Sequence, residues 1–115
     1  MFMSKNYWEF IWKSSQGMPW SSLENSGLQH DPYIKNKDYE SIKFSNILCG
    51  NYKYYCVLFF YQKKLTHIHV YSSSDNANEQ DALNYWKNNF GMKMNWNQCD
   101  ILDDKKSGYK YIIIS

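Results

Sequence analysis

Hydrophobic residues are densest between residues 41 and 72, where short polar breaks interrupt an apolar and aromatic pattern. Three β-prone segments fill this part of the chain: 41–49, 52–61 and 65–72. Gly50-Asn51, between the first two, is a typical two-residue hairpin turn. The pattern therefore predicts a three-stranded antiparallel meander whose central strand is apolar or aromatic on both faces.

A helical pattern follows the meander. Apolar residues between 82 and 90 recur at the three- and four-residue spacing of one helix face. Asp75 or Asn76 is the candidate N-cap, with Glu79 in the capping-box position relative to Asn76, and Gly91 is a typical stop. We expect a helix over about 76–90.

Two short helices are expected before the meander. The aromatic segment 5–13 has tryptophans at helical spacing, which favours a short helix there. The pattern Ser21-x-x-Glu24 resembles a capping box and Gly27 is a stop signal, so a second helix is expected over about 22–27.

The remaining segments predict a long loop and a final hairpin. Residues 28–39 are polar around Asp31-Pro32 and are expected to form an irregular loop. Residues 96–102 and 109–114 are expected to pair as strands, with the C-terminal strand inside the sheet because it is continuously β-prone. The whole predicts one α+β domain, 1–115, with an antiparallel sheet of about five strands and one main helix.

Strand pairing assigns side chains to two faces of the predicted sheet. We assume two-residue turns at Gly50-Asn51 and at either Gln62-Lys63 or Lys63-Lys64. The first face is then aliphatic and is expected to meet the helix over 76–90; it holds Ile42, Phe44, Leu48, Val57, Phe59, Ile68 and Val70. The second face is amphipathic and holds Ile47, Cys49, Tyr52, Tyr54, Cys56, Leu58, Phe60, Leu65, His67, His69 and Tyr71. We expect the N-terminal segment to cover part of this second face.

Composition narrows the function classes. All 13 basic residues are Lys, the net charge is only +2, and no basic stripe is evident, which disfavours nucleic acid as a partner. Aromatic residues make up 19% of the chain and suit both a compact core and a protein-binding surface. Three cysteines without regular spacing, and no signal-peptide or membrane-spanning pattern, indicate a reduced cytoplasmic protein.

The pair His67 and His69 is the strongest candidate for chemistry. Two imidazoles on one side of a strand, with Cys56 on the same predicted face, make a Cys-His-His metal site conceivable. A cluster with His30 in the preceding loop would instead suit acid–base hydrolysis. Structural histidines in the sheet and a small buried cysteine are the simpler interpretation, so we expect no catalytic residue, no bound metal and no cofactor.

By its size, single-domain form and lack of a catalytic motif, the chain resembles immunity proteins of bacterial polymorphic-toxin and contact-dependent growth inhibition systems. The resemblance implies a non-enzymatic antitoxin that occludes the active site or surface of a cognate toxin. Two alternatives remain: a phage-encoded inhibitor of a bacterial defence or host protein, and a small His- or metal-dependent hydrolase using His67 and His69.

The expected partner-binding residues come from the second face and the 28–39 segment. Aromatic anchors would fill the partner's cleft, and acidic residues would face a basic partner surface. They are Tyr52, Tyr54, Phe60, His67, His69, Tyr71, Asp31, Asp38 and Glu40. A protein partner is expected, with neither nucleic acid nor membrane, and the sequence leaves the oligomeric state open.

Overall fold

The computed structural model describes residues 4–72, 79–90, 94–106 and 110–115. In chain order the elements are α1 (Ser4–Lys13), α2 (Trp20–Ser26), β1 (Asp31–Lys35), β2 (Tyr39–Cys49), β3 (Tyr52–Tyr61), β4 (Lys64–Ser72), α3 (Glu79–Phe90), β5 (Cys99–Asp103) and β6 (Lys110–Ile114). The strands form one antiparallel sheet in the order β1-β2-β3-β4-β6-β5. The α+β class and the antiparallel sheet are therefore confirmed.

Within the described residues the sheet has six strands, where about five were expected, because the segment expected to be a loop contains β1. All five residues of β1 are exposed, so the strand lacks the alternating apolar pattern by which sequence reasoning finds strands. It forms by pairing with β2, where the backbone N–H of Ile34 also donates to Ser41 Oγ over 3.1 Å. The expected loop is thus partly an edge strand.

The meander and the final hairpin agree with expectation. Cys49 pairs with Tyr52 across the Gly50-Asn51 turn, and Tyr61 pairs with Lys64 across the second turn. The second turn therefore consists of Gln62 and Lys63, one of the two predicted alternatives. β6 lies between β4 and β5, as its continuous β-prone sequence indicates, and its Ile112 and Ile114 are fully buried.

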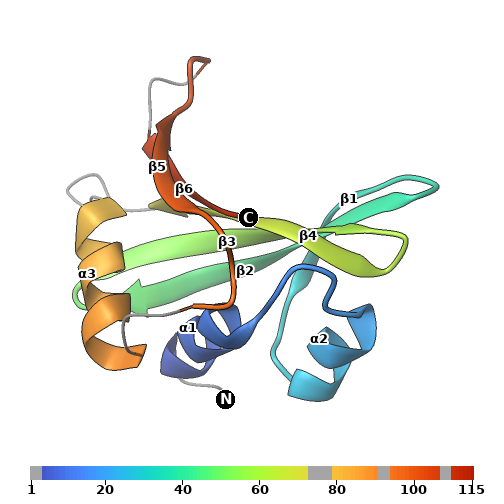
Figure 1. The fold of residues 1–115 in the computed structure, drawn as a ribbon, viewed down its shortest axis with the longest axis horizontal. Coiled ribbons are helices and arrows are strands. Elements are labelled where there is room, and N and C mark those ends of the chain that lie inside the picture. The colour runs from blue at the N-terminus through green and yellow to red at the C-terminus, as the bar shows by residue number, and fades with distance from the viewer. Residues whose placement is uncertain (1–3, 73–78, 91–93, 107–109) are drawn as a thin grey trace.

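The helices of the described part of the chain, α1, α2 and α3, lie on one side of the sheet (Figure 1). The indole of Trp8 in α1 packs against Trp86 in α3 with ring centres 5.1 Å apart, and against Tyr54 of β3 at 6.0 Å. Trp8 Nε1 donates to the carbonyl of Leu48 over 2.7 Å, which fastens α1 to β2. The expectation that the N-terminal segment covers the face opposite the main helix is wrong, because α1 and α3 bury their tryptophans against each other.

The short second helix begins earlier than its sequence suggested. Pro19 is the residue before α2 and makes no side-chain cap, so Ser21 lies inside the helix and the predicted capping box does not form. Instead the backbone N–H of Trp20 donates to the carbonyl of Lys63 over 2.8 Å, so a tertiary contact satisfies a donor of the first turn. The end is as predicted, since Gly27 has a φ of 71°. The predicted N-cap, Asp75 or Asn76, and the stop at Gly91 lie outside the described residues.

Two β-bulges decide which side chains face the helices. Phe44 pairs with Cys56 and Ile47 with Tyr54, so β2 has one more residue than β3 in this interval. Phe60 pairs with Leu65 and Phe59 with His67, so β4 also has one more residue than β3. Each extra residue shifts the alternation of its strand by one position relative to β3.

The predicted sorting of side chains is therefore wrong in part. The helix-covered face combines residues from both predicted faces: Ile42, Phe44, Ile47, Cys49, Tyr54, Cys56, Leu58, Phe60, Leu65, Ile68 and Val70, all of them buried. Phe44 and Val57, which were expected on one face, lie on opposite faces, because Val57 pairs with Lys43 and Phe44 pairs with Cys56. Val57, Phe59, His67, His69 and Tyr71 lie together on the other face.

Candidate binding surface on the sheet

Aromatic side chains gather on the face of the sheet that lies opposite the helices. They alternate along β3, β4 and β6 with the buried core residues, and each is half-buried. We call this surface the aromatic face; it consists of Tyr55, Phe59, His67, His69, Tyr71 and Tyr111 around the buried Val57. An outer sheet face that has only a structural role does not need so many large side chains, so their density here indicates a binding surface.

Ring stacking across neighbouring strands organises the aromatic face. Phe59 and His67 stack with ring centres 4.4 Å apart and an interplanar angle of 11°. Tyr55 and Tyr71 stack at 5.0 Å and 15°, and Tyr71 also stacks on Tyr111 at 5.4 Å and 24°. The flat faces of these rings cover one another. The rings therefore expose mainly their edges to a ligand, and these edges carry the hydroxyl groups and the imidazole nitrogen atoms.

One row of paired residues crosses the whole sheet on this side. In strand order it runs through Asp31, Lys43, Val57, His69, Ile113 and Asp100. Lys43 Nζ lies 4.4 Å from the ring centre of Tyr55, so the cation covers one end of the stacked rings. The surface is thus apolar and aromatic in its middle and carries charges of both signs towards its edges.

Burial disfavours the charged forms of four side chains of the aromatic face, namely Tyr55, His67, His69 and Tyr71. Desolvation lowers the pKa of His67, and desolvation together with the neighbouring His67 lowers the pKa of His69 to about 4. Desolvation, followed by the nearby Tyr55 and Tyr111, raises the pKa of Tyr71 to about 12, and burial also raises the pKa of Tyr55. At neutral pH the surface therefore presents uncharged hydrogen-bonding groups.

Three of the predicted partner-binding residues come together here, namely His67, His69 and Tyr71. Two others do not, because Tyr54 and Phe60 are 0% and 1% exposed in the helix-covered core, which corrects their assignment to a surface. The bulge in β4 explains the difference, since it moves the histidines to the face opposite Tyr54 and Phe60.

The remaining predicted residues are scattered. Tyr52 shares the helix-covered side with Tyr54 and packs at the margin of the core. Glu40 pairs with Phe60 at the end of β2 and forms an ion pair with Lys63. Asp31 lies at the edge of the aromatic face and Asp38 in the exposed β1–β2 turn.

Sequence reasoning missed Tyr55, Phe59 and Tyr111, although a signal for them exists. The apolar residues of β4 lie at positions 65, 68 and 70, which breaks the two-residue period after Leu65. Such a break indicates an inserted residue, and counting it would have placed the histidines beside Tyr55 and Phe59.

The histidine and cysteine combinations considered from the sequence do not form. Cys56 pairs with Val70 on the helix-covered side, whereas His69 pairs with Val57 on the aromatic face. His30 packs against Trp20, which in turn packs on the core residue Phe60, so it lies on the helix side of the sheet. Burial raises the pKa of the Cys56 thiol well above its ordinary value, which opposes nucleophilic chemistry there.

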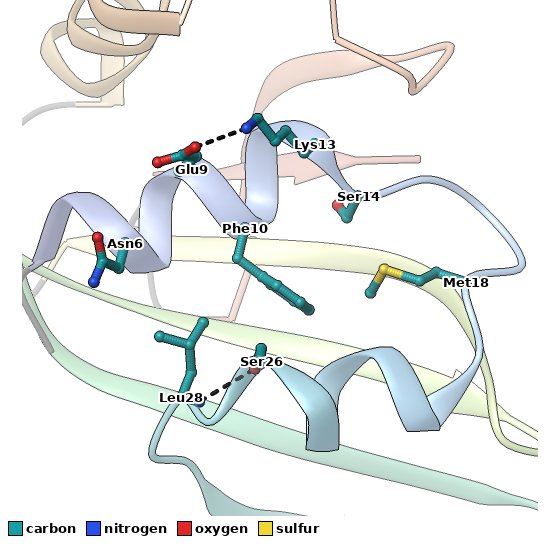
Figure 2. A pocket seen from close by; sticks show the side chains of 8 residues that line it. All are labelled: Asn6, Glu9, Phe10, Lys13, Ser14, Met18, Ser26 and Leu28. Atoms are coloured by element: carbon teal, nitrogen blue, oxygen red, sulfur yellow. Dashed lines mark hydrogen bonds and ion pairs between the residues drawn. The ribbon is translucent and has the colours of Figure 1, made fainter.

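A groove of about 350 Å³ lies on the other side of the molecule, between α1 and α2 (Figure 2). Phe10, Met18 and Leu28 supply its apolar surface. Glu9 and Lys13, on its rim, are exposed and satisfy each other in an ion pair of 2.7 Å. The groove offers space for an apolar side chain.

None of the described helices is both long enough and apolar enough to cross a bilayer. Comparison of the chain with protein-family models, with curated proteins and with solved structures finds no match in any of the three.

Proposed function

We propose that this protein is a non-enzymatic inhibitor that binds another protein through its aromatic face. The simplest form of this function is that of a cytoplasmic immunity protein, which neutralises a cognate bacterial toxin by occluding its active site or surface. The observation that carries the proposal is the cluster of stacked, half-buried tyrosine and histidine rings on the side of the sheet opposite the helices.

The arrangement of the rings favours a protein partner over a nucleic acid. Proteins that bind single-stranded nucleic acid offer flat ring faces on which bases stack, together with a basic groove. Here the stacked pairs cover each other's faces, and the chain has no Arg and a net charge of only +2. Tyrosine and histidine edges that combine apolar area with hydrogen-bonding atoms are typical of protein-recognition surfaces.

The mechanism follows from the composition of the surface. The rings of Tyr71 and Tyr111 lose little conformational freedom on binding because they are already held against each other. Lys43 and Asp100, near opposite edges of the sheet, would set the orientation of the partner through complementary charges. Occlusion needs no further group, because a substrate cannot enter the partner's cleft once these side chains fill it. A phage-encoded inhibitor of a defence or host protein would use the same surface in the same way.

The proposal is tested by measuring affinity with matched tyrosine variants. The candidate partner is the product of the adjacent gene, captured with the purified chain and then titrated by calorimetry. We expect Tyr71→Ala and Tyr111→Ala each to weaken binding by about 30-fold or more, as removal of an aromatic anchor does. Tyr52→Ala is the control, because Tyr52 is equally half-buried but lies on the helix-covered side of the same sheet.

Two results would overturn the proposal. One is an unchanged affinity in Tyr71→Ala and Tyr111→Ala with a loss in Tyr52→Ala, which would place the interface on the helix side. The other is substrate turnover by the purified chain that disappears in His67→Ala, which would establish the alternative of a His-dependent hydrolase. That alternative draws on the closeness of His67 and His69, whose ring centres are 5.0 Å apart.

A further inference from the structure

We propose that His67 and His69 together form a binding site for a divalent transition-metal ion of the kind that imidazole suits, such as Zn²⁺, Cu²⁺ or Ni²⁺. The site would lie within the aromatic face, but the inference does not depend on the proposed protein partner. It differs from the Cys-His-His site considered from the sequence, because Cys56 lies on the other side of the sheet.

The separation of the two imidazoles fits one shared ion. Two imidazoles that bind one ion through nitrogen at about 2.0–2.1 Å, with an angle between right and tetrahedral, have ring centres roughly 4.5–5.2 Å apart. The ring centres of His67 and His69 are 5.0 Å apart, with an interplanar angle of 49°. Two histidines at alternate strand positions are ordinarily about 7 Å apart at the backbone, so their side chains lean towards each other here.

Hydrogen bonds at His67 leave one ring nitrogen free to bind. The hydroxyl of Thr66 donates to the carbonyl of Phe59 over 3.0 Å, so towards His67 Nδ1, at 2.9 Å, it can only accept. His67 therefore carries its proton on Nδ1, and its Nε2 holds the available lone pair. A ligand histidine whose other nitrogen donates to an oxygen atom is the usual arrangement around protein-bound metals.

His69 has a corresponding partner in Tyr71. Its Nδ1 lies 3.1 Å from the Tyr71 hydroxyl oxygen, which can accept a hydrogen bond from Nδ1–H and so leave Nε2 to bind an ion. The Tyr71 ring is itself fixed by stacking on Tyr55 and Tyr111. Both histidines thus have a hydroxyl group that orients the ring before any ion arrives.

The number of protein ligands decides the kind of site. Within the described residues no third His, Cys, Asp or Glu completes a three-ligand group. The ion would keep its other positions for water, which makes the site exchangeable and distinct from a closed structural zinc site.

The test is calorimetric titration of the untagged chain with ZnCl₂, CuCl₂ and NiCl₂ in separate experiments. We expect at least one of these ions to bind at one ion per chain, with the affinity reduced at least about tenfold in His67→Ala and again in His69→Ala. His30→Ala is the control, since His30 lies on the helix side, and it should bind as the unaltered chain does. Circular dichroism of each variant shows whether it is folded.

A second pair of variants shows whether the hydrogen bond that orients His67 contributes to metal binding, as distinct from an effect on folding. Thr66→Val removes the acceptor for His67 Nδ1 and should weaken metal binding by about tenfold, whereas Thr66→Ser should restore it. Absence of binding for all three ions overturns the proposal, and so does binding that persists in a folded His67→Ala/His69→Ala double variant. Because no partner is needed, failure of this test is distinct from failure of the proposed inhibitor function.

Discussion

Trp96 and Ser14 are 82 residues apart in the chain and share a buried hydrogen bond, in which the indole Nε1–H donates to Ser14 Oγ over 2.9 Å. Ser14 Oγ in turn donates to the carbonyl of Ile11 over 2.6 Å at the end of α1. The two bonds join the segment before β5 to the N-terminal helix, and both Trp96 and Ser14 are buried.

Ser14→Ala should therefore lower the free energy of unfolding by about 1–3 kcal/mol, because it leaves the buried indole N–H of Trp96 without an acceptor. Urea denaturation followed by fluorescence measures the change. Ser15→Ala, at the neighbouring and less buried position, is the control and should have a much smaller effect. Equal losses at both positions would show that the hydrogen bond contributes nothing specific.

Trp8→Ala should be more damaging, with a loss of about 3–5 kcal/mol, because Trp8 is 1% exposed between α3 and the sheet. Trp20→Ala is a matched comparison: Trp20 is half-buried and packs on Phe60 with ring centres 4.8 Å apart. It should cost less, as judged by thermal unfolding of both variants. A smaller loss for Trp8 than for Trp20 would contradict the role of Trp8 as the contact between α1 and α3.

The stability of the fold should depend on pH through His69. Its pKa falls from 6.5 to about 4 on folding because of burial, so between these values the unfolded chain binds more protons than the folded one. Stability is then complete above about pH 6.5 and decreases as the pH falls towards 4. Allowing for the half-exposed position, we expect a loss of about 1–2 kcal/mol between pH 7 and pH 4.5.

Urea denaturation at a series of pH values checks this dependence. His69→Gln should flatten the curve, although His67, whose pKa is also lowered, leaves a residual slope in the same direction. A curve that is unchanged in His69→Gln would show that His69 titrates normally in the folded state.

Gln62→Asn should raise the free energy of unfolding by about 0.5–1 kcal/mol. Gln62 and Lys63 have φ values of 48° and 65°, and turns with two positive φ values favour Asn and Gly over long side chains. The backbone N–H of Gln62, which donates to the carbonyl of Asp38 over 2.8 Å, is kept in the variant. Gln62→Ala, which lacks the local hydrogen-bonding group, provides the comparison, and a gain in Ala equal to that in Asn would argue against the turn as the cause.

The meander, the main helix and the interior position of β6 could be predicted because local patterns determine them. Apolar periodicity, hairpin turn residues and a continuous β-prone run such as Tyr111–Ile114 act over short distances in the chain. The edge strand β1 could not be predicted, because it forms only through backbone pairing with β2 and buries no side chain.

The assignment of faces depended on a smaller signal. A single inserted residue in β2 and another in β4 change which side chains meet. Asn46, in the β2 bulge, has a φ of 57°, which Asn adopts more readily than most residues, whereas no residue type marks the bulge in β4. The candidate surface was thus predicted by residue type, through His67, His69 and Tyr71, but its other members came from the wrong side of β3. For β4, the position of the inserted residue can be found only from the spacing of the buried residues, which departs from a strict two-residue period.

The two bulges also allow the curvature of the sheet to change without a change in which side chains form the core. Deleting Asn46 would leave Phe44 opposite Cys56 and Ile47 opposite Tyr54, so every core residue of β2 would keep its side. Deleting Thr66 would do the same for Leu65 and His67. Because bulges increase the local twist of a strand, such deletions would straighten the sheet while the core remained intact. The curvature of the aromatic face can therefore vary between related sequences by loss or gain of single residues, without any compensating change beneath it.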